Sequence, residues 1–392
     1  MKASAVAVTA WTALSALGRS STEHAEALLA GRSGLTPCRL PVPFETVCGA
    51  VEGELGPLDG SLARFDTRTA RLAMLAYDGV RAPVERAIRR WGADRIALVL
   101  GTTSGGMPEF DAASVAWRTT GRLPAEFDYL RQQPLGAFSE ALRAITGIRG
   151  PRFVVSSACS SGAKVFASAR RLMRAGVVDA ALVGGVEALV ESTVYGFHSL
   201  GVLAPSACRP FGKDRPGMNL GEGAAYALLE REGDCAASLL GVGETSDAYH
   251  MSSPHPEGRG ALEAMRLAVA DAALAADAID HVNAHGTGTL HNDIAEARAI
   301  AQLFGERVPV TSTKGYTGHL LGASGAIEAI FAIECITRGI LPASLGAEPL
   351  DPEIAIRVVA SGATARVRTV LSNSFAFGGS NCALVLGSSE GA

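Results

Sequence analysis

Three features of this 392-residue sequence predict an α/β fold. Short runs rich in β-branched residues alternate with longer segments of helical periodicity, the order typical of parallel-rich sheets covered by helices. The same order occurs twice along the chain. Hydrophobic residues make up 48% of the chain and charged residues 19%, so a large core can be buried. We therefore expect two related halves, residues 1–232 and 233–392, joined at the polar turn 231–234.

The first half is expected to open with a strand at residues 3–10. Ser20 and Glu23 have the spacing of a capping box and predict a helix that runs to Leu29 and stops at Gly31. Pro83 could open a short helix, where its missing N–H costs little. The remaining elements are expected as helices at 64–80 and 138–145 and strands at 95–100, 179–184 and 224–230. Loop structure is expected at 37–62 and 196–222, and irregular structure with some helix at 107–135.

The second half repeats this plan. A strand at 308–312 leads toward a helix at 322–338, as a central strand from Phe153 leads into a helix that ends at Gly176. The other elements of this half are expected as strands at 238–243, 281–284, 368–371 and 382–386 and an amphipathic helix at 261–275.

Cys159 lies on the turn between the first half's strand and helix, in residues 154–162, VVSSACSSG. This position is similar to a nucleophile elbow, in which a tight turn raises the reactive atom above the sheet. The free N–H groups of the following helix favour a thiolate over a thiol. Taken alone, a free cysteine at a crowded turn is more often buried and inert.

Three later motifs change that balance. His285 lies in residues 283–289, NAHGTGT; His319 ends residues 312–319, STKGYTGH, before GASG at 322–325; and Phe377 lies in residues 372–381, SNSFAFGGSN. With Cys159, these four motifs resemble the β-ketoacyl–acyl carrier protein synthases of the thiolase superfamily, in order and in spacing. The resemblance spans most of the chain. It implies a thiolase-like fold, in which two pseudo-symmetric halves form a five-layer α-β-α-β-α sandwich.

The resemblance also implies a decarboxylative Claisen condensation. An acyl chain would be held on Cys159 and joined to malonyl-acyl carrier protein, giving 3-oxoacyl-acyl carrier protein. His285 and His319 would stabilise the enolate in a water-poor cavity, and the backbone N–H groups of Cys159 and Phe377 would face the acyl carbonyl. Lys314 and Glu328, fourteen residues apart, would form a buried pair that positions His319.

Further residues take roles from the same resemblance. Thr287 and Thr289 would bind the pantetheine amides, and Asp293 and Glu296 would lie near an ordered water or act as helix N-terminal charges. Phe377 would gate the acyl pocket, beside an Ala376 that replaces a common Gly and restricts the backbone. The acyl and substrate side would include Ser104, Phe197, Phe375 and Gly378. A basic patch for an acidic carrier would include Arg68, Arg71, Arg209 and Lys213.

Composition excludes several other classes. A net charge of −4 gives no reason to expect nucleic acid, and seven scattered Cys without CxxC spacing fit a reducing cytoplasm with no disulfides and no metal site. No signal peptide or bilayer-spanning run is evident. The resemblance implies no cofactor beyond the phosphopantetheine of the carrier. It also implies a homodimer, or a heterodimer with a chain-length-factor-like subunit.

Residues 163–171, AKVFASARR, and 196–200, GFHSL, look more like the synthases of aryl polyene pathways than like housekeeping enzymes. A housekeeping fatty-acid 3-oxoacyl synthase is the alternative. A non-catalytic chain-length partner is disfavoured because Cys159, His285 and His319 are all present. A Cys–His hydrolase would need an orienting Asp or Asn, and a nicotinamide dehydrogenase a G-x-G-x-x-G after the first strand; neither is found.

Overall fold

The computed structural model describes residues 5–389, and within them a sheet of eleven strands forms the centre of the molecule. β1 (Val6–Leu14) lies between β7 and β8 and pairs antiparallel with both, so it joins the strands of the two halves. On one side follow β7 (Gly223–Glu230), β6 (Ala180–Glu187), β4 (Ile96–Gly101) and β5 (Arg152–Val155). On the other follow β8 (Ala237–Ser246), β15 (Ser380–Ser388), β14 (Thr369–Ala376), β9 (His281–Ala284), β10 (Pro309–Ser312) and β12 (Arg357–Val358).

The internal repeat is visible in the strand directions. In the first half, β1, β7 and β6 pair antiparallel, and β6, β4 and β5 pair parallel. In the second half, β8, β15 and β14 pair antiparallel, and β14, β9 and β10 pair parallel. Each half therefore has the same strand order and the same change of direction, as the repeated sequence pattern predicts.

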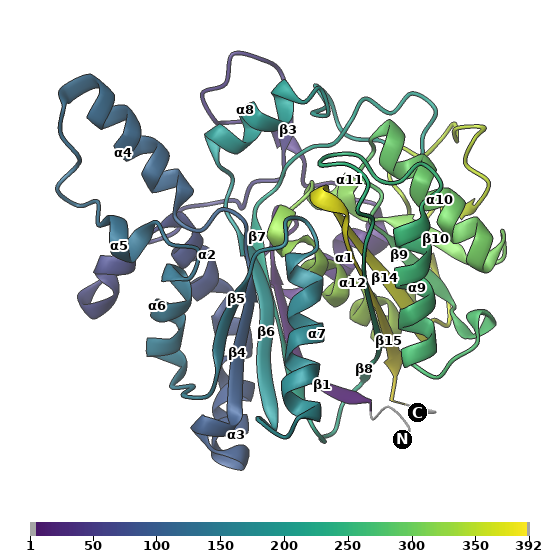
Figure 1. Ribbon diagram of the computed structural model, residues 1–392, viewed down its shortest axis with the longest axis horizontal. Coiled ribbons are helices and arrows are strands. Elements are labelled where there is room, and N and C mark those ends of the chain that lie inside the picture. Colours follow the sequence, from purple (N-terminus) through teal and green to yellow (C-terminus); the bar gives the residue numbers. More distant parts are fainter. Residues whose placement is uncertain (1–4, 390–392) are drawn as a thin grey trace.

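Helices cover both faces of the strands and separate the two halves (Figure 1). The buried middle layer holds α1 (Ser21–Ala30), α7 (Ser161–Arg174) and α12 (Ser324–Arg338), and α7 packs directly on α12. The outer face of the first half carries α2 (Arg68–Tyr77), α3 (Arg81–Trp91) and α6 (Ala137–Thr146). That of the second half carries α9 (Arg259–Asp271) and α10 (Leu290–Phe304). The predicted α/β layering is confirmed.

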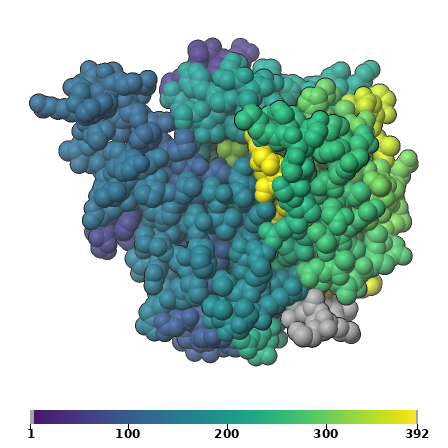
Figure 2. Space-filling view, viewed as in Figure 1, coloured from purple at the N-terminus to yellow at the C-terminus, as the bar shows by residue number. Residues whose placement is uncertain are grey.

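The smaller elements lie around this frame. They are β2 (Thr36–Pro37), β3 (Val47–Cys48), α4 (Met107–Thr120), α5 (Tyr129–Gln132), α8 (Glu191–Ser199), α11 (Lys314–Thr317), β11 (Ile340–Leu341) and β13 (Ala363–Thr364). Figure 2 shows the first half in blue and teal beside the second half in green, with part of the yellow C-terminal segment between them. No helix within residues 5–389 is both long and apolar enough to span a membrane.

Several expectations were wrong in detail. The strand that contains Phe153 is β5, at the edge of the sheet and not at its centre, and the Phe153 side chain is 49% exposed. A β-branched run signals burial but does not say whether a neighbouring strand follows on both sides. The last residues of α8 occupy the start of the expected loop at 196–222, whereas residues 107–135 contain the fourteen-residue α4, in line with the expected mixture of irregular structure and helix. Residues 3 and 4 of the first expected strand lie outside the described residues.

Candidate active site

Cys159 lies where β5 ends and α7 begins. Ala158, directly before it, adopts the left-handed region with φ of 49°, which is unfavourable for a residue with a Cβ and marks a sharp turn. The Ser161 hydroxyl holds the turn by donating to the Ala158 carbonyl (2.6 Å) and accepting from the Ser157 N–H (2.8 Å). The sulfur is thereby placed at the floor of a cavity with the residue only 6% exposed.

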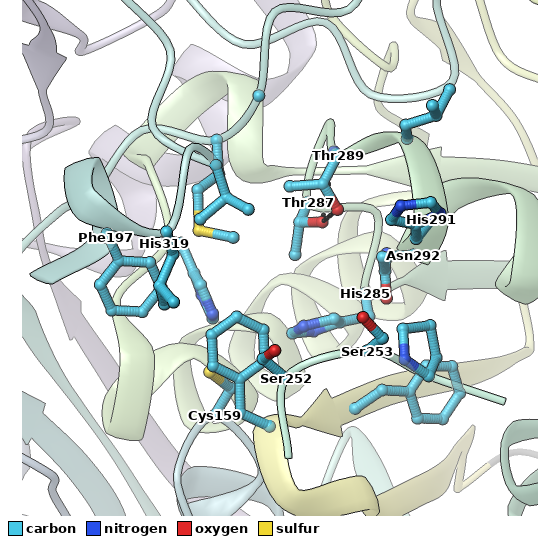
Figure 3. Close-up of a pocket in the computed structure, with 18 of the residues that line it drawn as sticks. Cys159, Phe197, Ser252, Ser253, His285, Thr287, Thr289, His291, Asn292 and His319 are labelled. Carbon is cyan, nitrogen blue, oxygen red and sulfur yellow. Dashed lines mark hydrogen bonds between the residues drawn. The ribbon is translucent and has the colours of Figure 1, made fainter. Parts of the chain in front are cut away.

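This cavity has a volume of about 490 Å³ and is bordered by both halves of the chain. Cys159 comes from the first half, and His285 and His319 come from the second. Figure 3 shows the two imidazoles reaching into the space beside the Cys159 sulfur, with Thr287 and Thr289 farther along the wall. The three residues that the sequence motifs singled out are therefore brought together.

The two histidines face each other nearly edge to face, with ring centroids 5.2 Å apart and an interplanar angle of 81°. His285 follows the end of β9, and its backbone N–H donates to Glu296 Oε1 at 2.8 Å. His319 follows α11 through Gly318, whose φ of 73° suits glycine, and its N–H donates to the Asn219 carbonyl at 2.7 Å. Backbone hydrogen bonds thus fix both loops.

Lys314 contacts His285 directly and forms no hydrogen bond with His319 within residues 5–389, which differs from the role expected for it, although its charge also acts on His319. Its Nζ donates to Glu328 Oε1 (2.5 Å) and to the His285 carbonyl (2.7 Å), and it lies 3.5 Å from His285 Nδ1. The Lys314 side chain extends toward the end of β9, and His319 lies beyond the single turn of α11 that begins at Lys314. His319 Nδ1 instead contacts Ser324 Oγ.

Truncating the carboxylate of the buried pair should destabilise the fold. Lys314 and Glu328 expose only 2% and 3% of their side chains, so Glu328→Ala leaves a buried ammonium without its counter-ion. We expect a loss of about 3–5 kcal/mol in the free energy of unfolding, read from the urea midpoint. The double variant Lys314→Met/Glu328→Ala is the control and should recover much of that loss. Equal midpoints for Glu328→Ala and the parent protein would contradict the pairing.

The electrostatics of the cavity follow from burial. Burial, helped by the positive charge of Lys314, holds the pKa of His285 and of His319 well below the ordinary histidine value, so both rings are neutral at pH 7. Burial also raises the pKa of the Cys159 thiol to about 12, although Lys314 and the N–H groups of Phe377 and Cys159 act in the opposite direction. The helix terminus was expected to favour a thiolate at Cys159, and burial of the sulfur acts against that charge.

Phe377 lies directly after β14, next to the sulfur. Phe377 borders the same cavity as Cys159, and the backbone N–H groups of both residues act to lower the pKa of the Cys159 thiol. The Phe377 ring stacks on Phe197 at 5.8 Å, and Phe375 lies 6.0 Å from the His285 ring. Ala376 has an extended backbone, with φ of −121° and ψ of 153°, which any residue can adopt, so alanine causes no strain there. Gly378 has φ of 79° and donates its N–H to the Met251 carbonyl.

The predicted supporting residues Asp293 and Glu296 mainly accept hydrogen bonds from backbone N–H groups. Glu296 accepts from the N–H groups of His285 and Gly286, and Asp293 accepts from those of Phe211 and Gly288. Both carboxylates therefore fix the loop that carries Thr287 and Thr289, whose hydroxyls lie 2.9 Å apart. Both carboxylates are buried, and Asp293 lies in the first turn of α10, as the helix N-terminal alternative expected.

Ser104 does not border the described cavity. Its N–H donates to Glu187 Oε1 at 2.7 Å, and the residue is buried with that carboxylate. Glu187 was not singled out by its sequence context, yet it also accepts from the Gly322 N–H in the other half. A lone Glu at the end of a buried strand gave no pattern that marks such a contact.

The predicted docking cations divide into two pairs. Arg68 makes a two-point ion pair with the buried Glu222 (2.7 and 2.5 Å), and Arg71 makes one with Asp66 (2.6 Å each). Their guanidinium groups are thus occupied within the chain, which weakens their assignment as docking residues. Arg209 and Lys213 are exposed and form no ion pair within residues 5–389.

Comparison with known proteins places the chain among related enzymes. The model of the beta-ketoacyl synthase N-terminal domain matches residues 89–234, and that of the C-terminal domain matches residues 236–348. The chain is 32% identical to a 3-oxoacyl-[acyl-carrier-protein] synthase 2 of Synechocystis sp., over 97% of each chain. It is 33% identical to nodulation protein E of Rhizobium meliloti, over 97% of this chain and 98% of the relative.

Solved structures agree with this placement. The ketosynthase ApeO of Xenorhabdus doucetiae, solved in complex with its chain length factor ApeC, is 38% identical with a TM-score of 0.93, over 98% of each chain. The ishigamide ketosynthase/chain length factor is 28% identical with a TM-score of 0.89, over 98% of this chain and 99% of that chain. Fold and relatives together define an acyltransferase with a thiolase-like fold. The chain belongs to the beta-ketoacyl synthase family.

Proposed function

We propose that this protein catalyses the decarboxylative condensation of an acyl chain held on Cys159 with malonyl-acyl carrier protein. The observation that carries the proposal is the meeting of the Cys159 sulfur with two neutral imidazoles in one enclosed cavity. The relatives named 3-oxoacyl-[acyl-carrier-protein] synthase 2 support the same reaction.

In the first step, the Cys159 sulfur attacks the carbonyl of an acyl-carrier thioester. A new C–S bond forms, the carrier's C–S bond breaks, and the carrier leaves as a thiol with the proton that Cys159 gives up. Exchange of one thioester for another costs little free energy. The N–H groups of Cys159 and Phe377 would stabilise the oxyanion of this step, since both residues border the cavity and their N–H groups already favour negative charge on the sulfur.

In the second step, the malonyl C–C bond breaks, carbon dioxide leaves, and the electron pair forms an enolate. The enolate carbon attacks the acyl carbonyl, the bond to Cys159 breaks, and the sulfur recovers a proton from solvent. His285 and His319 donate from their ring N–H groups to the enolate oxygen, and the ammonium of Lys314 adds positive potential beside His285. Thr287 and Thr289 border the cavity and would bind the amides of the carrier's phosphopantetheine arm, the only prosthetic group that the proposed reaction uses.

We further propose that the chain elongates a polyene or polyketide, as the sequence of residues 163–171 and 196–200 suggested. The 38% identity to a ketosynthase solved with its chain length factor supports this assignment. The housekeeping fatty-acid synthase remains the second candidate, because the 3-oxoacyl-[acyl-carrier-protein] synthases 2 are similar over nearly the whole chain.

A choice of substrates tests this assignment. The purified protein, alone and after co-expression with candidate partner subunits, is offered malonyl-carrier with saturated and polyunsaturated acyl-carriers of equal length. We expect faster elongation of the polyunsaturated chain, measured by mass spectrometry of the carrier products. The Cys159→Ala variant gives the background. Equal or faster elongation of saturated chains would favour the housekeeping alternative.

The assembly proposal is a dimer, either of two copies or with a chain-length-factor-like subunit. Two surfaces support it. Within the described residues β5 pairs with β4 alone, which leaves its other edge open beside the exposed Phe153. α4 and α5, which extend from the body in Figure 1, expose Trp117, Tyr129 and Leu130.

For the carrier, Arg209 and Lys213 are the better docking candidates, because they are exposed and unpaired in the described part of the chain.

A further inference from the structure

We propose that Ser324 is a positioning residue that fixes the proton of His319 on Nε2, the nitrogen that faces the cavity. The inference rests on the proposed function, in which His319 donates a hydrogen bond to the enolate. It assigns to Ser324 the positioning role that the sequence had given to the Lys314–Glu328 pair.

The contact is short and buried. Ser324 Oγ lies 2.7 Å from His319 Nδ1, and each residue is 1% exposed. Ser324 is the first residue of α12, five residues beyond His319. The intervening turn is fixed from the other half, because the Gly322 N–H donates to Glu187 Oε2 at 2.7 Å. Neither the hydroxyl nor the ring can therefore move away without breaking a buried contact.

The direction of this hydrogen bond follows from what the hydroxyl can reach. Within residues 5–389, the His319 ring is the hydrogen-bond partner of Ser324 Oγ. If Nδ1 carried the proton and donated it, the hydroxyl hydrogen would be buried without an acceptor, which is costly. The hydroxyl therefore donates, Nδ1 accepts, and the single ring proton of the neutral imidazole is on Nε2.

The two histidines thus obtain the same tautomer from different neighbours. His285 Nδ1 faces the ammonium of Lys314 at 3.5 Å, a group that can only donate. His319 lacks that contact and depends on the Ser324 hydroxyl. Figure 3 shows the His319 ring extending from the wall toward Cys159, so its remaining N–H points at the reacting centre. Without Ser324, the other tautomer becomes accessible and presents a lone pair to the enolate.

The test compares three buried-serine variants. For Ser324→Ala we expect decarboxylation and condensation to slow about tenfold, the change that the loss of one ordinary hydrogen bond produces. Acyl loading of Cys159 should keep its rate. Ser324→Thr retains the hydroxyl and should restore most of the rate. Ser139→Ala, a buried serine on α6 far from the cavity in the chain's outer layer, is the matched control and should leave both steps unchanged.

A spectroscopic measurement separates positioning from packing. Nitrogen-15 spectra of histidine-labelled protein should give the Nε2–H signature for His319, assigned by its loss in His319→Gln, and a mixture of tautomers in Ser324→Ala. An Nδ1–H signature in the parent protein would overturn the inference, even if the alanine variant does not fold. Full condensation by Ser324→Ala, with His319→Ala impaired, would also overturn it and leave the proposed function intact. Full condensation by His319→Ala would instead reject the proposed function.

Discussion

Cys159→Ala is expected to abolish acyl transfer and leave a folded protein. The variant removes the sulfur that would form the acyl thioester, and no other residue that lines the described cavity carries a thiol. Because Cys159 sits at a turn and alanine fills most of the same space, the unfolding midpoint should change little. Intact-mass spectrometry after incubation with acyl-carrier measures the adduct directly, and condensation product should fall to the background.

The control for this experiment is Cys235→Ala, a half-buried thiol in the segment that leads into β8. It should load acyl chains and condense them as the parent protein does. Peptide mapping of the loaded protein should place the acyl group on Cys159. An adduct of equal yield in Cys159→Ala would show that the nucleophile is elsewhere, and the proposed mechanism would then be wrong.

His285→Ala and His319→Ala should separate the two half-reactions. Each variant loses one hydrogen-bond donor to the enolate, and the loss of such a donor in a dry site typically slows a reaction about 100- to 1000-fold. Acyl loading needs the sulfur and the backbone N–H groups, so it should persist in both variants. Carbon dioxide release and 3-oxoacyl product report the second step, and the intact acyl adduct reports the first. Unchanged product yield in either variant would contradict its assignment.

The pH dependence gives a second check on the same residues. The pKa of both histidines lies well below the ordinary value, so neither ring gains a proton as pH falls from 8 through 6.5. The rate of condensation from preloaded enzyme should therefore show no histidine inflection near pH 6.5. The free energy of unfolding, in contrast, should depend on pH. Below pH 6.5 these two histidines bind protons in the unfolded chain but not in the folded chain. The contribution of these histidines is complete above pH 6.5 and is lost as pH falls below it.

The motifs alone led to the correct family and to the residues that now meet in one cavity. The strand-turn-helix signal around Cys159 and the Gly-rich turns around His285 and His319 are local patterns, and each appears where expected. The internal repeat could also be predicted, because the sequence of each half shows the same alternation of strand and helix patterns. These features depend on neighbours in sequence, which is why single-sequence reasoning reaches them.

Contacts between residues that are distant in the chain were harder to predict from the sequence. The spacing of Lys314 and Glu328 correctly suggested a pair, but nothing in it told which histidine the ammonium would touch. Arg68 and Arg71 have the spacing of an exposed basic patch, yet their partners Glu222 and Asp66 were not suggested by that pattern. A cation is free to dock only if the fold leaves it unpaired, and this depends on residues up to 154 positions away.

The order of elements, the four motifs and the repeat were determined by the sequence itself, because they are encoded by local periodicity and turn chemistry. The edge position of β5, the burial of the Cys159 thiol and the contact of Ser324 with His319 were decided by the tertiary structure. The physical reason is common to all three. The burial of an atom and its hydrogen-bond partners depend on which residues surround it in the folded chain. Around this site those residues come from both halves of the chain.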